Sequence, residues 1–283
     1  MKKILIAAAI LTLLAPSAFA QLKLPRVSQK ASVTQTIGLT DVTVTYSRPG
    51  VKGRTIWGDL VPYDKVWRTG ANEATSIAFA RDVTINGKAL PAGTYSLHTI
   101  PGKTAWTIIF NKKADQWGSY EYDATQDALR VEVKPAAGPN VEWMTFSFPD
   151  VKTDSAQVEL AWEKVRVAFT IGADTTNQAL ADIRKAMAGE VKEWNVPFGA
   201  AGFVHNNNLD NKAEAMKWID QSIAMKEVFW NLRLKAQMLA KDGKKTDAVA
   251  VGERAVAVGK ADPDAADEIP RLEKQIAEWR SGK

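Results

Sequence analysis

The sequence contains no cysteine. This absence excludes disulfide bonds, thiolate metal sites and every mechanism with a cysteine nucleophile, so the fold must be stabilised by burial of apolar surface. Only two histidines are present, His98 and His205. A metal site built from several histidines is therefore excluded, and we expect neither a metal ion nor a cofactor.

Motifs of known enzymes are also missing. The chain has no Gly-x-Ser-x-Gly elbow and no phosphate-binding loop. Asn206, Asn207, Asn208 and Asp210 lack the glycine and the final glutamate of an EF-hand loop. No catalytic residue can be named from a motif, and the sequence favours a protein that is not an enzyme.

The N-terminus has the pattern of a cleavable signal peptide. Lys2 and Lys3 precede an uncharged apolar run from residue 4 to residue 15, and Ala18-Phe19-Ala20 offers small residues for a signal peptidase. The run is shorter than the roughly 20 residues that span a bilayer, and no later apolar run approaches that length. We expect residues 1–20 to be removed and the protein to be exported, to the periplasm or the medium, without a membrane span.

The charge of the chain is only mildly basic. Lys2 and Lys3 account for two of the five net positive charges, which leaves +3 on the mature protein. A nucleic-acid-binding protein would present a clustered basic face instead. We therefore expect no nucleic-acid partner.

Residues 28–172 have the alternation of short β-strands. Asn86-Gly87 between two short apolar runs predicts a β-hairpin with a type I′ turn. Proline and glycine pairs separate the other runs. The pattern predicts an antiparallel β-sandwich or jelly-roll-like domain. The alternating apolar residues form these sets: Val42, Val44 and Tyr46; Tyr95, Leu97 and Thr99; Trp106, Ile108 and Phe110; Leu129, Val131 and Val133; Met144, Phe146 and Phe148; Val158, Leu160 and Trp162; Val165, Val167, Phe169 and Ile171.

Residues 174–283 change to a helical period. Apolar stripes predict helices around Leu180, Ile219, Leu232, Val251 and Leu272, whereas Pro197 and Gly199 make residues 189–202 ambiguous. Ala215 and Ala248 lie in similar contexts 33 residues apart. This spacing resembles that of tetratricopeptide repeats, about 34 residues. Because such repeats bury a core only by stacking, we expect these helices to dock on the β domain or on a protein partner. An unrelated helical bundle is the alternative.

The β segment resembles an uncharacterised family, the domain of unknown function 2911. The resemblance implies an exported bacterial protein with this architecture and no known activity, so it assigns no catalytic residue. Most of residues 28–170 take part. The matching blocks are residues 32–38, Tyr46 to Arg54, Val61-Pro62-Tyr63, Val66 to Glu73, Leu90 to Leu97, Ile108 to Lys112, Gln116-Trp117-Gly118 and Tyr122-Asp123.

Three loops carry the polar residues that could face a ligand. If these loops share one end of the sandwich, they form a cationic pocket walled by Trp57, Trp67 and Trp117, in which arginine forks bind a carboxylate or phosphate. The tryptophans could instead form a platform for a glycan. The loops contain Arg48, Lys52 and Arg54; Trp67, Arg68, Asn72 and Glu73; and Asn111, Lys112 and Trp117.

Two other interpretations compete with a pocket. Arg48 and Arg68 could pair with Asp59, Asp64 or Glu73 and only fasten the loops, which predicts a structural envelope scaffold. Alternatively, Arg68, Glu73 and His98 could meet in the active site of a hydrolase or isomerase acting on a small polar or glycan substrate. Our leading hypothesis is an exported, non-enzymatic module for a small anionic or glycan ligand or a protein partner. Its candidate residues are Arg48, Arg54, Trp67, Arg68, Asn72, Glu73, His98 and Trp117.

Overall fold

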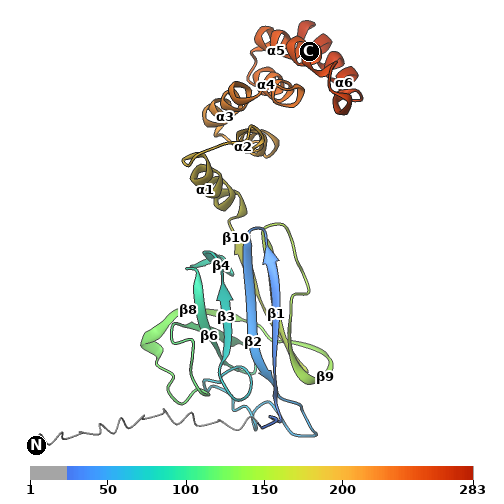
Figure 1. The fold of residues 1–283 in the computed structure, drawn as a ribbon. Coiled ribbons are helices and arrows are strands. Elements are labelled where there is room, and N and C mark those ends of the chain that lie inside the picture. The colour runs from blue at the N-terminus through green and yellow to red at the C-terminus, as the bar shows by residue number, and fades with distance from the viewer. Residues whose placement is uncertain (1–23, 283) are drawn as a thin grey trace, which may run out of the picture. The chain divides into compact units, whose positions relative to one another are not determined.

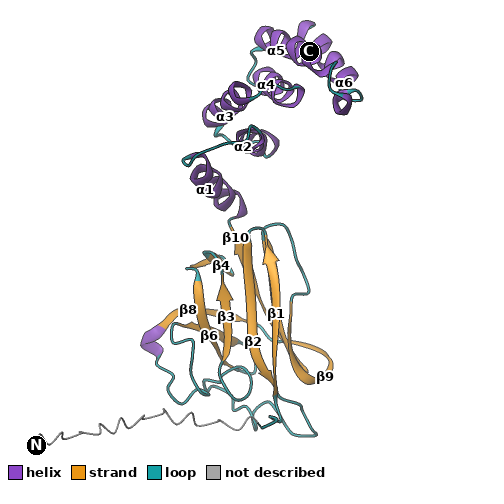
Figure 2. Ribbon diagram, viewed as in Figure 1, coloured by secondary structure: helices purple, strands orange, loops and turns teal. Residues whose placement is uncertain are grey.

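The computed structural model describes residues 24–282, which form two compact units. One unit ends at Thr175 and the other begins at Thr176. Figure 2 shows that the strands lie in the first unit and the α-helices in the second. This distribution confirms the predicted β domain followed by a helical region. The predicted signal peptide, residues 1–20, lies outside the described residues.

The β unit consists of two antiparallel sheets (Figure 1). The larger sheet has the strand order β1-β2-β3-β6-β7-β8 and the smaller has the order β5-β4-β10-β9. Residues of both sheets belong to one buried apolar cluster, so the sheets enclose a common core. The strands are β1 (Gln29–Ile37), β2 (Thr40–Arg48), β3 (Thr75–Phe79), β4 (Val83–Ile85), β5 (Lys88–Leu90), β6 (Gly93–Ile100), β7 (Trp106–Asn111), β8 (Asp127–Val133), β9 (Ala136–Ser147) and β10 (Ser155–Ala173). A 3-10 turn, η1 (Ala124–Gln126), precedes β8.

The predicted alternation decides which side chains face this core. On β2, Val42, Val44 and Tyr46 are buried in the core cluster, whereas Thr43 and Thr45 lie on the outer face of the sheet. On β6, Leu97 faces the core and His98 lies on the outer face. The outward positions of β2, β3 and β6 include the hydroxyl residues Ser47, Ser76 and Thr94, which line one cavity.

Two details of the strands depend on residues with positive φ. The hairpin between β4 and β5 turns at Asn86 and Gly87, with φ values of 47° and 81°, as the type I′ prediction requires. The two apolar runs around Trp162 and Val165 were expected as separate segments. They form one strand of 19 residues, because a bulge with Glu163 at φ 51° shifts the alternation within β10.

The second unit is helical along most of its length. The helices are α1 (Thr175–Met187), α2 (Asn195–Asn206), α3 (Lys212–Met225), α4 (Phe229–Lys241), α5 (Lys245–Gly259) and α6 (Ile269–Arg280), with a 3-10 turn η2 (Pro263–Ala265) between α5 and α6. Within the described part of the chain, no helix has the length and apolarity needed to cross a membrane. The likeness to tetratricopeptide repeats stays a prediction.

The segment predicted as ambiguous contains a complete helix. Pro197 is the third residue of α2, where its missing N–H leaves no intrahelical hydrogen bond unmade. Ala200, Ala201 and Val204 then bury one face of α2 against neighbouring helices. Burial of this face outweighs the low helix propensity of Gly199.

Candidate functional site

Two of the three predicted loops meet at one cavity of about 210 Å³. We call this cavity the basic pocket. It is bounded by the loop after β2, which contributes Lys52 and Arg54, and by the loop before β3, which contributes Trp67 and Arg68. Trp162 of β10 also lines it. No aspartate or glutamate of residues 24–282 is among the lining residues. The charged lining residues are therefore all basic, and the Glu142 carboxylate, which accepts from Lys52 N at 2.8 Å, lies outside the lining.

Backbone bonds hold the first of these loops. Val51 N donates to Glu142 O at 2.8 Å, and Lys52 adopts a positive φ of 49°. The guanidinium of Arg54 donates to Gly50 O at 2.6 Å and to Val51 O at 3.1 Å. Arg54 thus fastens its own loop through carbonyl oxygens, which leaves its positive charge without a carboxylate.

Arg68 is half-buried in the pocket wall and has no acidic partner. Its Nε atom is buried and unpaired, and no ion pair within the described residues includes it. Burial lowers the pKa of Arg68, an effect that nearby Tyr120 partly opposes. The indole Nε1 of Trp162 is likewise buried without a partner. Two hydrogen-bond donors of the pocket lining are therefore unsatisfied, at a cost of about 1–3 kcal/mol each.

The tryptophans form a cluster beneath the pocket instead of a ring around it. Trp57 packs edge-on to Trp67, Trp106 and Trp162, with ring centroids 5.9, 5.0 and 5.7 Å away, and Trp67 stacks on Trp162 at 5.9 Å. Of the three tryptophans predicted as walls, Trp67 alone lines the basic pocket. Trp57 belongs to the cluster, and Trp117 lies at the other face of the larger sheet.

The predicted Arg–carboxylate pairs are wrong. Arg48 donates instead to Met144 O at 2.9 Å and to the Thr145 hydroxyl at 2.7 Å, which ties β2 to β9. Glu73 accepts two bonds from Arg26, at 2.5 and 2.7 Å. The hydrogen bond from Arg26 lowers the pKa of Glu73.

The remaining candidates do not line the basic pocket. Asn72, at φ 58°, donates to Ser28 O at 2.9 Å. Trp117 pairs with Glu73 in an isolated β-bridge, and the Arg26 guanidinium carbon lies 5.5 Å from the centroid of its ring. The structure therefore separates Asn72, Glu73 and Trp117 from Arg54, Trp67 and Arg68.

His98 is fully buried on the outer face of β6. Its Nδ1 lies 3.3 Å from the Ser119 hydroxyl, its ring packs 5.1 Å from that of Tyr122, and its Nε2 is unpaired. Burial lowers the pKa of His98 to about 4. No hydrogen bond or ion pair among residues 24–282 joins any two of Arg68, Glu73 and His98. The contacts therefore give the predicted catalytic trio no support.

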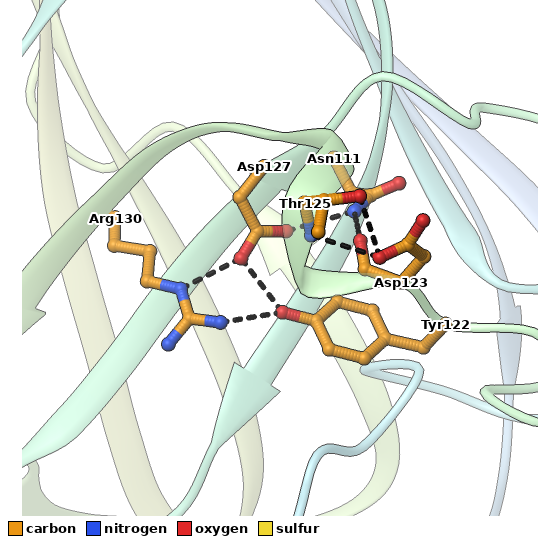
Figure 3. Close-up of polar contacts among 6 residues, drawn as sticks. All are labelled: Asn111, Tyr122, Asp123, Thr125, Asp127 and Arg130. Atoms are coloured by element: carbon orange, nitrogen blue, oxygen red, sulfur yellow. Dashed lines mark hydrogen bonds and ion pairs between the residues drawn. The ribbon is translucent and has the colours of Figure 1, made fainter.

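A polar network fixes the segment that covers His98 (Figure 3). Asn111 donates to Asp123 O at 2.9 Å and to Asp127 at 2.8 Å. Tyr122 and Arg130 each donate to the second oxygen of Asp127 at 2.7 Å. These bonds hold Tyr122 and Asp123 to the end of β7 and the start of β8. The third predicted loop thus lies over the outer face of the sheet, and none of its residues lines the basic pocket.

Two contributing residues escaped the sequence prediction. Trp162 lies in the alternating pattern of a strand, which identifies it as a core residue but does not say which cavity borders it. Gln116 is 5% exposed and lines a second cavity, yet nothing in its sequence context marks it. No cluster of three potential metal ligands occurs in the part of the chain that the structure describes.

Together, fold and cavity define a two-sheet β domain with a basic pocket above a tryptophan cluster, followed by a helical region. The chain belongs to the family described as protein of unknown function (DUF2911), whose model matches residues 28–171. The match covers the β unit. Neither the comparison with curated proteins nor the comparison with solved structures found a match.

Proposed function

We propose that this chain is an exported, non-enzymatic binding protein whose basic pocket holds a small carboxylate or phosphate group. The observation that carries the proposal is Arg68: a half-buried guanidinium with an unpaired, buried Nε in a pocket lined by no acid. An uncompensated cation is costly inside a protein, and an incoming anion would supply the missing partner.

Neighbouring groups support the same ligand chemistry. Lys52 and Arg54 add positive charge to the lining, and the Trp162 Nε1 adds a neutral donor. All of these groups donate hydrogen bonds, and an oxyanion accepts them without bringing a donor of its own. The helices of the second unit remain a predicted docking surface for a protein partner.

The test is binding of defined anions to the mature protein. Inorganic phosphate, citrate and D-glucuronate are titrated at constant ionic strength, with chloride as the reference, by calorimetry and by thermal melting. A ligand at 100 times its Kd stabilises the folded state by about 2.7 kcal/mol. The phosphate and the two carboxylate arms distinguish which oxyanion the pocket prefers.

Arg68→Met is the decisive variant, and Lys88→Gln is its control. Both remove one positive charge, but Lys88 is exposed on β5 and does not line the pocket. We expect Arg68→Met to abolish binding while its melting temperature stays equal or rises, because an unpaired cation is replaced by an apolar chain. Lys88→Gln should bind like the wild type. Unchanged binding by Arg68→Met, or no binding of any anion by the wild type, refutes the pocket; a large fall in stability of Arg68→Met supports the structural scaffold.

A further inference from the structure

A second cavity, of 250 Å³, lies on the outer face of the larger sheet. We call it the outer groove. Its floor is a row of hydroxyl side chains on β2, β3 and β6, including Ser47, Ser76 and Thr94. Its wall is the segment before Trp117, which includes Asp115 and Gln116. The outer groove shares no lining residue with the basic pocket.

Backbone bonds keep this wall in place. Ala74 N donates to Gln116 O at 3.0 Å, and Gly118 N donates to Asn72 O at 3.2 Å. These bonds hold residues 116–118 against the segment that leads into β3. The groove is therefore preformed, which reduces the entropy lost when a ligand binds.

One deeply buried acceptor of the groove lining lacks a hydrogen-bond partner among the described residues. Gln116 donates through Nε2 to the Ser96 hydroxyl at 3.0 Å and to Lys113 O at 2.8 Å. Because a carbonyl oxygen only accepts, the second bond fixes the orientation of the amide. The opposite atom, Gln116 Oε1, is buried and unpaired. Ser47 is 3% exposed and also lines the groove, where it offers a hydroxyl group.

The character of these groups selects the ligand. Gln116 Oε1 and the Asp115 carboxylate are acceptors only, so a phosphate or carboxylate, which has no donor to offer, does not satisfy them. The charges nearly cancel, because Glu73 forms an ion pair with Arg26, and the remaining charged residues of the lining, Lys30 and Asp115, have opposite signs. A neutral ligand rich in hydroxyl groups meets these requirements, since each hydroxyl both donates and accepts.

Trp117 gives such a ligand an apolar surface. Trp117 is 57% exposed. It directly follows Gln116 and forms a β-bridge with Glu73, and both of these residues line the groove. Large exposed aromatic residues offer an apolar face that is available for contact. A pyranose ring has an apolar face of C–H groups and a rim of hydroxyls. We propose that the outer groove, with Trp117 at its edge, binds a neutral saccharide.

The experiment uses the mature protein and a panel of neutral sugars: maltose, cellobiose, xylobiose and N,N′-diacetylchitobiose. Binding is measured by calorimetry, and contact with the groove by protection of its amides in NMR or hydrogen-exchange experiments. Trp117→Ala is compared with Trp143→Ala; Trp143 is also an exposed tryptophan, but it is bridged to Gly50 of the basic pocket and not to a residue of the groove lining. Ser47→Ala and Ser76→Ala probe the floor without altering the wall.

We expect at least one sugar of the panel to bind. Trp117→Ala should weaken binding about tenfold or more, and Ser47→Ala about fivefold, the effect of one lost hydrogen bond. Trp143→Ala and Arg68→Met should bind the sugar as the wild type does. The proposal is overturned if no sugar binds, if Trp117→Ala and Ser47→Ala both bind normally, or if binding disappears in Arg68→Met, which would place the sugar in the basic pocket.

Discussion

The basic pocket and the outer groove share two stretches of backbone but have opposite chemistry. The end of β2 and the segment before β3 contribute Gly50 and Arg68 to the pocket, and Ser47 and Glu73 to the groove. The pocket presents unpaired donors and positive charge, whereas the groove presents one unpaired amide oxygen, hydroxyls and almost balanced charge. These two segments therefore contribute to two cavities, whose ligands would not compete for the same side chains.

The two cavities also differ in what supports them. The pocket rests on the tryptophan cluster, which belongs to the core between the sheets. The groove rests on the outer face of one sheet and on a loop segment held by backbone bonds. A substitution in the core should therefore change the pocket and also lower the stability of the whole β unit. A substitution at the rim of the groove should change only the groove.

The largest effect is expected from Trp162→Ala. Trp162 is 1% exposed and packs on Trp57 and Trp67. Removing a buried indole costs about 3–5 kcal/mol, through lost burial and the remaining cavity. The measurement is chemical denaturation of the β unit followed by far-UV circular dichroism. Trp117→Ala is the control and should change stability by about 0.5 kcal/mol or less. If both variants lost the same free energy of unfolding, the core would not support the pocket more than it supports the groove.

A smaller effect is expected in the pH dependence of folding stability, and it arises from His98 on the outer face of the larger sheet. Burial under the segment of residues 112–126 lowers the pKa of His98 to about 4. The unfolded chain therefore binds more protons between pH 6.5 and 4, so stability is full above pH 6.5 and falls as the pH decreases through this window. At about 1.4 kcal/mol per unit, the loss at pH 4 is on the order of 3 kcal/mol.

His98→Asn isolates this contribution. Carboxylates with lowered pKa values, such as Glu73, lose stability in the same direction as the pH falls. The informative quantity is therefore the difference in melting temperature between wild type and His98→Asn at pH 7 and at pH 4.5. That difference should shift in favour of the variant at the lower pH. A constant difference would mean that His98 is protonated or solvated in the folded protein, and that the loop covers it less tightly.

Much of the architecture followed from the sequence, because period-2 and period-3.6 patterns are local. The hairpin at Asn86-Gly87 was predicted from two residues, since few dipeptides adopt two consecutive positive φ values. The continuous strand β10 and the helix α2 were missed, because a bulge and the burial of one helix face depend on distant partners.

The site was predicted less completely, because the contacts between its side chains depend on the tertiary structure. Sequence identified Arg54, Trp67 and Arg68 as loop residues, and the structure places these three at one cavity. It could not say that Glu73 pairs with Arg26, 47 residues away, or that Trp117 lies at a different face. The local sequence around an arginine or a carboxylate in a loop does not indicate which side chain it contacts in the folded protein.

The smallest effect tests the charge balance that distinguishes the groove from the pocket. Arg26 and Glu73 form an ion pair whose side chains are 52% and 44% exposed, so water and salt screen it. A double-mutant cycle with Arg26→Gln and Glu73→Gln should give a coupling of about 0.5 kcal/mol at low salt and less at high salt. Glu73→Gln removes the carboxylate that interacts with Arg26 and Lys30, and Asp115 is then the one acid among the described residues of the groove lining. That variant should gain weak, salt-sensitive affinity for phosphate even when Arg68→Met has removed the basic pocket. If the Arg68→Met, Glu73→Gln double variant binds no phosphate at low salt, neutrality of the groove depends on more than this pair.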